Sequence, residues 1–297
     1  MKLLITGGTG FIGKSLLKEL DFSSKDFNVL ALSRSPLFDF SSSNVEWFKC
    51  DLLDVTSFKD KIAEFKPEVL IHLAWDGIPD FSFEKCLLNL NASINLVNSV
   101  LEIGSIKRVI TTGSCFEYNK SIGICSESDE CKPKDYFTWS KNTFREYLQI
   151  ETSKRKIKFG WARLFYVYGP NQREGSLIPT ILKDLKESKS PNIRTPLNAN
   201  DFVYVDDVAR GIISMLNEDF ISGIYNLGSG NSTPVIKICE MVELELYNQV
   251  ILSKQLIDRA KNSEKSVDFY ADIEKSTEKL KWTPKINLKE GIKLIKL

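Results

Sequence analysis

The sequence contains little histidine and no long run of charge of one sign. Its 297 residues include one histidine, His72, with 40 basic and 39 acidic residues and a formal net charge of +1. No apolar run approaches the roughly 18 residues that a membrane-spanning helix requires. The charge balance gives no electrostatic basis for binding nucleic acid or an anionic membrane. We therefore expect neither nucleic acid nor a membrane as a partner.

The cysteines are not spaced as metal ligands. They are scattered through the chain as Cys50, Cys86, Cys115, Cys125, Cys131 and Cys239. We interpret the first residues as a strand and not as a secretion signal, which indicates reduced thiols in the cytoplasm. We expect no metal site, and we regard oxidation of Cys125 and Cys131 to a disulfide as a minor alternative.

The most informative feature that is present is the segment 2–13, KLLITGGTGFIG. A short apolar strand is followed by Gly7, Gly10 and Gly13, and then by residues with helical spacing. Glycine adopts the backbone angles of a tight turn at little cost, and the N-terminus of a helix favours a diphosphate. Gly13 allows the helix to pack close to the strand. The segment therefore predicts a nucleotide-binding turn.

Strands and helices alternate along the first half of the chain. This alternation predicts parallel βαβ units with right-handed crossovers, and so an α/β fold with a Rossmann-type, doubly wound parallel sheet. The expected strands are 2–6, 27–32, 45–48, 68–73, 107–112 and 157–164. The expected helices are 11–20, 56–65, 82–103 and 135–153.

The pattern changes at about residue 168, where proline and glycine divide the chain into short elements. We expect residues 1–168 to form a dinucleotide-binding domain, with 205–227 returning to its sheet as a helix and a strand. Residues 169–204 and 228–297 are expected to form a smaller C-terminal α/β domain for the substrate. Ligands of such sheets bind at the carboxyl ends of the strands.

The end of strand 27–32 bears on the choice of cofactor. In this fold an acidic residue about 20 positions after the glycines holds the ribose 2′-hydroxyl of NAD. Here Ser33 and Arg34 follow the strand, without an acid. A guanidinium suits a 2′-phosphate, so we expect NADP. If Arg34 is an ordinary surface residue, NAD is the alternative.

Asp51 and Leu52 follow strand 45–48 at the same expected edge of the sheet. The Asp51 carboxylate is placed to accept a hydrogen bond from the adenine amino group. Its alternative role is that of a turn residue or of a cap for helix 56–65.

Several motifs together resemble the extended short-chain dehydrogenase/reductases, and among them the NAD-dependent epimerase/dehydratase family. They include TGGTGFIG, HLAW, VITTGSCFEYN at 109–119, YFTWSKNTFRE at 136–146 and YNLGSG. The resemblance extends to the segment 271–292. It implies the fold described above and an enzyme that acts on a nucleotide sugar.

The resemblance also implies site residues. Ser114 matches the catalytic hydroxyl, and Lys141 matches the catalytic lysine that binds the nicotinamide ribose. Matches to the family's cofactor-binding positions are Gly7, Gly10, Phe11, Ile12, Gly13, Leu73, Ala74, Asn89, Phe165 and Val167.

One position departs from the family pattern. The family's catalytic tyrosine stands four residues before the lysine, and this position is Phe137, whereas Tyr136 stands five before Lys141. One residue rotates a side chain by about 100° on a helix. Either Tyr136 donates the proton from a distorted first turn, or a water, Ser114 or a substrate hydroxyl does so.

Residues after Ser114 narrow the expected reaction. Relatives that dehydrate nucleotide sugars carry an Asp-Glu pair where this chain has Cys115 and Phe116. The resemblance therefore favours NADPH-dependent reduction, at C4, of an NDP-4-keto-6-deoxyhexose, with dTDP as the expected nucleotide, in the synthesis of bacterial polysaccharide deoxysugars. The alternatives are an NDP-hexose 4-epimerase with bound NAD, and a cofactor-binding protein without turnover because of Phe137.

Helix 82–103 is more apolar than one buried face requires. Members of the resembled family often pair this helix and the one at 138–153 with the same helices of a second copy. We therefore expect a homodimer.

Overall fold

The computed structural model describes residues 1–23, 26–35, 44–256 and 266–295. The chain divides into two compact units. The first consists of Met1–Asn119, Glu130–Arg163 and Ala209–Tyr225. The second consists of Lys120–Asp129, Leu164–Val208 and Asn226–Leu297.

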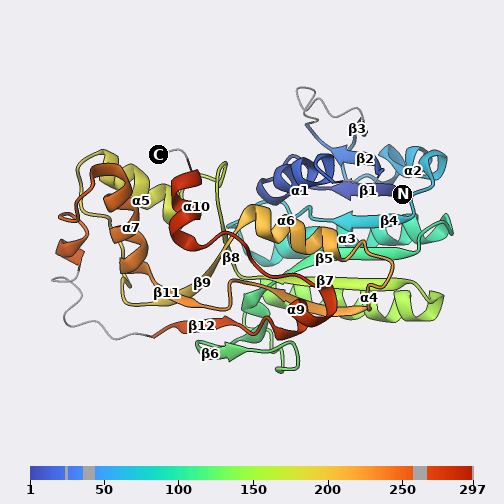
Figure 1. The fold of residues 1–297 in the computed structure, drawn as a ribbon. Helices are drawn as coiled ribbons and strands as arrows, with labels where there is room; N and C mark the ends of the chain where they lie inside the picture. The colour runs from blue at the N-terminus through green and yellow to red at the C-terminus, as the bar shows by residue number, and fades with distance from the viewer. Residues whose placement is uncertain (24–25, 36–43, 257–265, 296–297) are drawn as a thin grey trace. The chain divides into compact units, whose positions relative to one another are not determined.

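The first unit is built on a seven-stranded sheet with the order β10-β7-β5-β4-β1-β2-β3 (Figure 1). Its strands are β1 (Lys2–Thr6), β2 (Asn28–Ser33), β3 (Val45–Lys49), β4 (Val69–His72), β5 (Arg108–Ser114), β7 (Lys158–Leu164) and β10 (Gly223–Leu227). Strands β1 to β5 pair in parallel. Because β1 lies between β2 and β4, the strand order reverses beside β1, where such sheets bind dinucleotides. The predicted doubly wound fold is confirmed.

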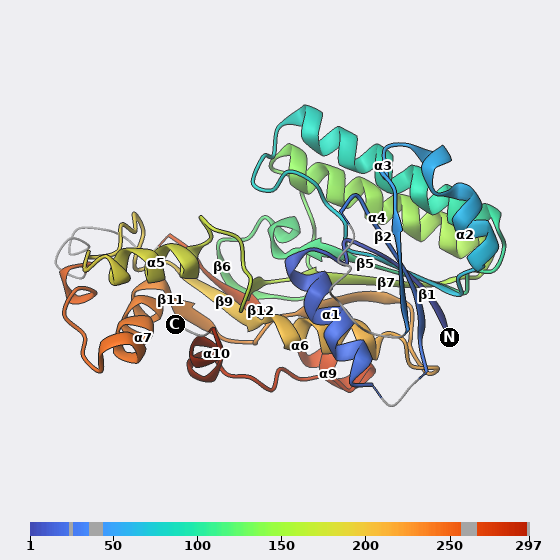
Figure 2. The same cartoon turned by 90° about the horizontal axis from the view of Figure 1, so that it is seen from above.

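Helices cover both faces of this sheet. They are α1 (Phe11–Asp21), α2 (Lys59–Phe65), α3 (Phe83–Glu102), α4 (Tyr136–Arg155) and the second half of α6 (Val205–Ser214). Figure 2 shows α2, α3 and α4 on one face and α1 on the other. On the α1 face, Arg210 of α6 pairs with Glu19 of α1 at 3.2 Å.

The main core lies between the sheet and the helices α3 and α4. Leu4, Leu30, Leu70 and Val109 of the strands are completely buried. They pack in one cluster with helix residues such as Leu96, Val97, Val100, Phe144 and Leu148. Each side chain of this size contributes about 1.5–3 kcal/mol on full burial. The strands β1, β2, β4 and β5 are thereby held firmly at the positions from which their carboxyl ends build a site.

The start of α4 is defined by a side-chain cap. The Asp135 carboxylate accepts a hydrogen bond from the Thr138 backbone N–H at 2.7 Å. The Thr138 hydroxyl in turn accepts one from the Asp135 N–H at 3.2 Å. Such a reciprocal box satisfies two donors that the helix leaves unpaired. Regular helix therefore begins at Tyr136, and this sets the direction of every later side chain on α4.

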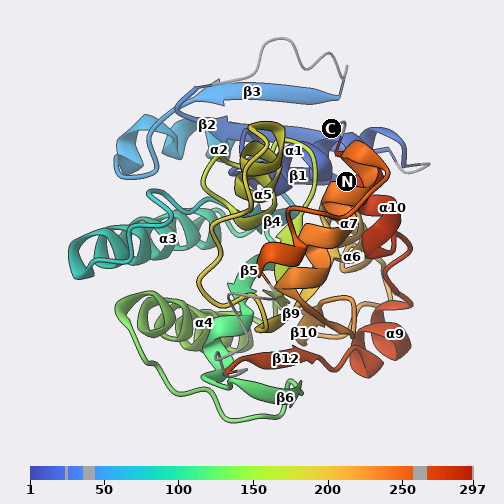
Figure 3. The same ribbon diagram turned by 90° about the vertical axis from the view of Figure 1, so that its left-hand side faces the viewer.

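The second unit contains a five-stranded sheet with the order β11-β9-β12-β6, to which β8 adds by pairing with β9. Its strands are β6 (Ile122–Cys125), β8 (Tyr166–Tyr168), β9 (Ala199–Tyr204), β11 (Ser232–Pro234) and β12 (Asp268–Ala271). Figure 3 shows β6 beside β12, with which it pairs in parallel. The helices of this unit include α5 (Leu177–Lys186), α7 (Val235–Tyr247), α9 (Glu274–Leu280) and α10 (Leu288–Leu294).

A buried carboxylate fastens this second sheet. Asp201 of β9 has no exposed surface and accepts hydrogen bonds from the N–H groups of Ser229, Gly230 and Ala271. It thereby joins β9 to β12 and to the turn after β10.

The sequence-based domain boundaries differ from the two units at residues 164–168, 205–208 and 226–227, which lie in the second unit, and most of all at residues 120–129. We expected this segment in the first domain, but the structure places it in the second unit because β6 pairs with β12. Among the described residues, no helix is long and apolar enough to cross a membrane.

Candidate active site

The glycine turn after β1 leaves no room for a side chain at Gly7 or at Gly13. Gly7 has a φ of +75°, and a Cβ there would lie 2.7 Å from the Ala74 nitrogen. A Cβ on Gly13 would lie 2.1 Å from the Gly7 carbonyl oxygen. Gly10 caps α1 without a side chain, and the first turn of α1 carries no acidic residue. The positive end of α1 is therefore free of a built-in anion, and the cradle suits the diphosphate of a dinucleotide.

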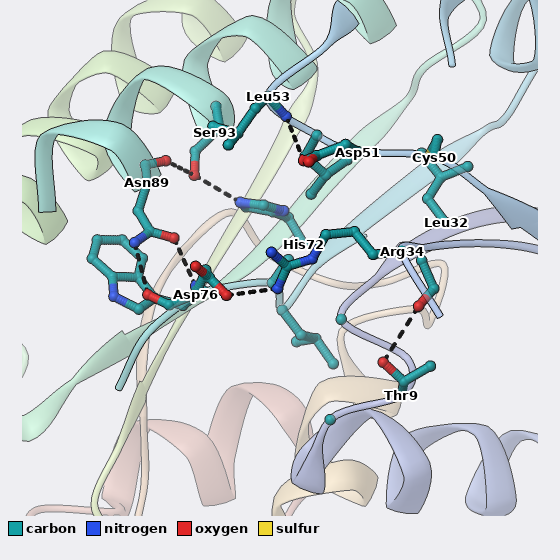
Figure 4. A pocket seen from close by; sticks show the side chains of 18 of the residues that line it. Thr9, Leu32, Arg34, Cys50, Asp51, Leu53, His72, Asp76, Asn89 and Ser93 are labelled. Carbon is teal, nitrogen blue, oxygen red and sulfur yellow. Dashed lines mark hydrogen bonds and ion pairs between the residues drawn. The ribbon is translucent and has the colours of Figure 1, made fainter. Parts of the chain in front are cut away.

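A pocket opens beside this turn, at the carboxyl ends of β1, β2, β3 and β4 (Figure 4). Its wall includes residues that we predicted to bind the cofactor. They are Gly7, Gly10, Ser33, Arg34, Asp51, Leu52, Leu73, Ala74 and Asn89. The structure therefore brings together, around one pocket, residues that are as much as 82 positions apart in the sequence.

The other predicted cofactor residues do not line this pocket. Phe11, Ile12 and Gly13 form the first turn of α1. Phe165 and Val167 lie in the second unit, where the Phe165 ring contacts Phe269 at 6.1 Å. Several residues of the wall were not predicted from the sequence, namely Thr9, Leu32, Cys50, Leu53, His72, Trp75, Asp76, Leu88, Ala92 and Ser93. Thr9 could have been found from its place inside the glycine turn, whereas Ala92 and Ser93 carry no local signal.

Arg34 forms an ion pair at the rim of the pocket. Its guanidinium lies 2.6 Å from the Asp76 carboxylate, as Figure 4 shows. The other Asp76 oxygen lies 3.0 Å from the ammonium of Lys85. Hydrogen bonds from Lys85 and Arg34 lower the pKa of Asp76. Arg34 therefore connects the end of β2 with the loop after β4.

Asn89 of α3 holds that loop in place. Its side-chain oxygen accepts the Asp76 N–H at 2.7 Å, and its amide donates to the Asp76 carbonyl at 2.9 Å. Asn89 thus fixes the backbone that lines the pocket.

Asp51 forms a local turn as well as part of the wall. Its carboxylate accepts the Leu53 N–H at 3.0 Å. The short helix that follows is capped by Asp54, which accepts from Thr56. The capping alternative for Asp51 is therefore wrong, and the turn alternative is confirmed. Asp51 lines the pocket, and its hydrogen bond to an adenine stays a prediction.

His72 is a buried structural residue. Its ring nitrogens lie 2.6 Å from the Thr6 hydroxyl and 2.9 Å from the Ser93 hydroxyl. Burial, with a smaller effect of Lys141, lowers the pKa of His72 to about 3. The imidazole is therefore neutral at physiological pH and does not act as a general acid.

Lys141 is buried on α4 beside the end of β5. Its ammonium donates to the Thr112 carbonyl at 3.0 Å and lies 4.1 Å from the centre of the Trp75 ring. Burial lowers the pKa of Lys141 to about 8, while Glu117 and Cys86 act in the opposite direction. The lysine is thus a desolvated cation whose proton is held less tightly than that of a surface lysine.

Ser114 lies two residues beyond Thr112, at the end of β5. Its hydroxyl oxygen accepts the Phe116 N–H at 3.2 Å, and its own N–H donates to Glu117 at 2.8 Å. The hydroxyl hydrogen remains able to donate to a ligand. Ser114 and Lys141 therefore both lie at the end of β5.

Tyr136 does not join this pair. It is 53% exposed, and its ring contacts Phe83 at 5.3 Å. Phe137 instead lies within the site, with its ring 5.4 Å from Trp75 and 5.9 Å from the Lys141 ammonium. Because α4 is regular from its first residue, the distorted turn that would have brought Tyr136 inward is not formed. The position facing Lys141 carries a phenyl ring without a hydroxyl.

The sheet, the glycine turn and the pocket at the switch point define a dinucleotide-binding protein of the Rossmann type. The sequence profile of the NAD dependent epimerase/dehydratase family matches residues 3–228, and the chain belongs to this family.

Similar proteins are found among curated sequences and solved structures. The chain is 26% identical to dTDP-4-dehydro-6-deoxyglucose reductase of Escherichia coli, covering 99% of this chain and 96% of the relative. It is 27% identical to a putative UDP-glucose 4-epimerase of Methanocaldococcus jannaschii, with the same coverage. The crystal structure of Thermotoga maritima UDP-glucose 4-epimerase with UDP-glucose superposes with a TM-score of 0.82 at 22% identity, covering 99% of this chain and 97% of that chain. The structural likeness confirms the fold.

Proposed function

We propose that this protein reduces the C4 carbonyl of an NDP-linked 4-keto-6-deoxyhexose, with NADPH as reductant and dTDP as the nucleotide. The proposal is supported by membership of the family and by the similarity to the E. coli reductase. It is also supported by the arrangement of Ser114 and Lys141 at the end of β5. We place this activity in the cytoplasm, in the synthesis of polysaccharide deoxysugars.

The observation that carries the proposal is the turn after Ser114. Elimination of water from a sugar needs an acid and a base that can exchange protons with the substrate. Cys115 and Phe116 can supply neither carboxylate of such a pair. The carboxylate of this turn, Glu117, is completely buried and accepts bonds from Ser114 and Trp161. Reduction of a carbonyl, which besides the hydride of the cofactor needs only polarisation of the carbonyl and one proton, is therefore favoured over dehydration.

The chain's own residues supply the polarisation. When bound, the nicotinamide supplies the hydride. Ser114 donates its hydroxyl hydrogen to the carbonyl oxygen, and the buried ammonium of Lys141 stabilises the negative charge that develops there. Because Phe137 has no hydroxyl, the proton for the new alcohol comes from Ser114, a water or a substrate hydroxyl.

For the cofactor, we propose that Arg34 selects NADPH. The residues of the glycine turn hold the diphosphate. Arg34 stands at the end of β2, and no acidic residue beside it in the sequence is available to bind the ribose 2′-hydroxyl of NAD. Its ion pair with Asp76 shows that the guanidinium reaches the rim of the pocket.

The experiment that tests the function is a reduction assay with dTDP-4-keto-6-deoxyglucose. We expect consumption of added NADPH and a product whose configuration at C4 is determined by NMR. Failure to oxidise NADPH with a panel of 4-keto nucleotide sugars would contradict the proposal.

A second candidate is an NDP-hexose 4-epimerase, which the similarity to the M. jannaschii protein favours. An epimerase of this kind keeps its NAD throughout the cycle. Release of NAD from the purified protein on denaturation, together with no use of added NADPH, would favour this candidate. Binding of dinucleotide without either activity would instead indicate a cofactor-binding protein in which Phe137 has abolished turnover.

We also propose a homodimer that pairs α3 and α4 with those of a second copy. Large apolar side chains remain exposed on these two helices, namely Phe83, Leu88, Tyr136 and Ile150. Phe83 and Tyr136 contact each other, and large apolar side chains exposed next to one another are typical of association surfaces.

A further inference from the structure

A buried cluster of charges lies directly behind Ser114. Glu117 has no exposed surface, and Arg145 and Arg163 are 8% and 1% exposed. One Glu117 oxygen lies 2.8 Å from the Arg145 guanidinium and 3.0 Å from that of Arg163. Trp161 donates to the same carboxylate at 3.1 Å. The cluster joins the turn after β5 to α4 and β7.

Such a cluster is not explained by stability alone. Removing charges from water is costly, and well-packed apolar residues of similar volume are often equally stable or more so. What a fully bonded carboxylate adds is a fixed position for each group that donates to it. The groups attached to Glu117 therefore indicate what the cluster orients.

The first of these groups is the backbone of Ser114. Its N–H donates to the Glu117 carboxylate at 2.8 Å, so the residue with the reactive hydroxyl is attached to the cluster without an intervening side chain. Gly113 leaves the space for this contact. A Cβ at Gly113 would lie 2.1 Å from the Glu117 oxygen and 2.1 Å from the Trp161 indole nitrogen.

The second group is Lys141, which the cluster affects through charge. Arg145 stands four residues after Lys141 on α4, so the bond from Arg145 to Glu117 also holds the helix face that carries the lysine. The titratable groups that act on Lys141 are Glu117 of the turn, Cys86 of α3 and His72 of β4. Burial raises the pKa of Cys86 and lowers that of His72, so both are neutral. Glu117 is thus the anion among these groups.

We propose that Glu117 is a positioning residue for the reaction, which fixes the backbone of Ser114 and maintains the ammonium of Lys141. This inference rests on the proposed function, in which Ser114 polarises the carbonyl and Lys141 carries the charge. Glu117 itself does not touch the substrate.

Two substitutions separate the two parts of this role. Glu117→Asp keeps the charge but is one methylene shorter, so it cannot reach the Ser114 N–H and both arginines together. We expect kcat to fall about 100-fold, as for other displacements of about 1 Å, with little change in KM. Glu117→Gln keeps the acceptor oxygen but loses the charge. We expect the fall of kcat at alkaline pH to occur about one pH unit lower than in the wild type.

The titration of Lys141 gives a readout that does not depend on turnover. We expect the ε-¹⁵N NMR signal of Lys141, assigned with Lys141→Arg, to titrate at lower pH in Glu117→Gln than in the wild type. The control is Glu243→Gln. Glu243 is also a buried carboxylate, which accepts the backbone N–H groups of residues 251–253 in the second unit. Its loss should lower Tm and leave kcat and the Lys141 titration unchanged.

Gly113→Ala is the variant to use if the Glu117 variants do not fold. It retains every side chain of the cluster but forces the Glu117 carboxylate away from Ser114. Its kcat should therefore fall about as far as that of Glu117→Asp. The inference is overturned if folded Glu117 or Gly113 variants keep the wild-type kcat and Lys141 titration. A wild type that reduces no 4-keto sugar would refute the proposed function instead, and the NMR titration would still test the effect of Glu117 on Lys141.

Discussion

At the residue scale, the proposed chemistry depends on two neighbours on α4, Tyr136 and Phe137. The first lies on the surface against Phe83, and the second lies beneath the Lys141 ammonium. The one-residue shift from the family pattern is visible in the sequence, but which of the two rings lies beside Lys141 is not. The outcome is fixed by Asp135, whose cap makes the first turn of α4 regular.

This geometry predicts the effects of adding a hydroxyl at residue 137 and of removing the hydroxyl at residue 136. Phe137→Tyr places a phenol one helical turn before Lys141, and we expect kcat to rise about 10-fold or more because a positioned general acid is added. Tyr136→Phe is the matched control and should keep kcat, because Tyr136 points away from the site. The measurement is steady-state NADPH oxidation. Loss of activity in Tyr136→Phe would contradict this account.

The pH dependence follows from Lys141. Its pKa of about 8 in the folded protein means that the ammonium, the form that stabilises the oxyanion, is present below this pH and lost above it. We therefore expect kcat to be constant from pH 6 to about 7 and to fall above about pH 8. The Lys141→Arg variant stays charged throughout this range, so it should be less active but should show no fall of kcat at alkaline pH. A fall of the same shape in this variant would mean that a group other than Lys141 causes it.

The proposed preference for NADPH depends on a single exposed side chain, Arg34. We expect Arg34→Ala to weaken NADPH binding about 10-fold or more, the loss of one charge-assisted contact to a phosphate, and to leave NADH binding nearly unchanged. Dissociation constants from fluorescence titration measure both. Equal losses for the two dinucleotides would show that Arg34 does not contact the 2′-phosphate.

At the element scale, the strands β1 to β5 and their helices could be predicted because each is long or strongly apolar. The predicted strand 68–73 and the observed β4, Val69–His72, differ by one residue at each end. The strands of the second unit could not be predicted in the same way. β8 and β11 have three residues each, which is too short to show an alternating pattern. Their sheet forms by pairing between segments far apart in sequence.

The glycine turn is the element on which cofactor binding depends most directly. Gly13→Ala would place a Cβ against the Gly7 carbonyl, so we expect loss of dinucleotide binding and about 1–3 kcal/mol of destabilisation. Gly104→Ala is a useful comparison, because Gly104 has a φ of +75° but open space around its Cβ position. It should lower stability by about 1 kcal/mol and leave binding intact. Urea denaturation and dinucleotide titration measure the two effects.

The candidate site was predictable only where a local motif marks it. The glycines, Ser114 and Lys141 stand in recognisable segments. Glu117, Arg145 and Arg163 do not, because their contacts arise only when β5, α4 and β7 are packed together. The surroundings of a reactive side chain are therefore harder to predict than the side chain itself.

At the scale of the whole molecule, the proposed association of two copies into a homodimer is the property to test. We expect a dimer mass by light scattering at micromolar concentration. Ile150→Glu places a charge on an exposed apolar position of α4 and should shift the protein to monomers, because an unpaired buried charge is costly. Ile221→Glu, at an equally exposed position outside these helices, is the control. A monomer mass for the wild type would exclude the dimer.

A final consequence follows from the sole imidazole of the chain. It is enclosed between two hydroxyl groups and keeps its neutral form down to about pH 3. Most proteins gain positive charge from histidine as their surroundings become moderately acidic, from about pH 7 to about pH 5. This protein has no histidine that responds in that interval, so moderate acidification adds no positive charge to it from histidine.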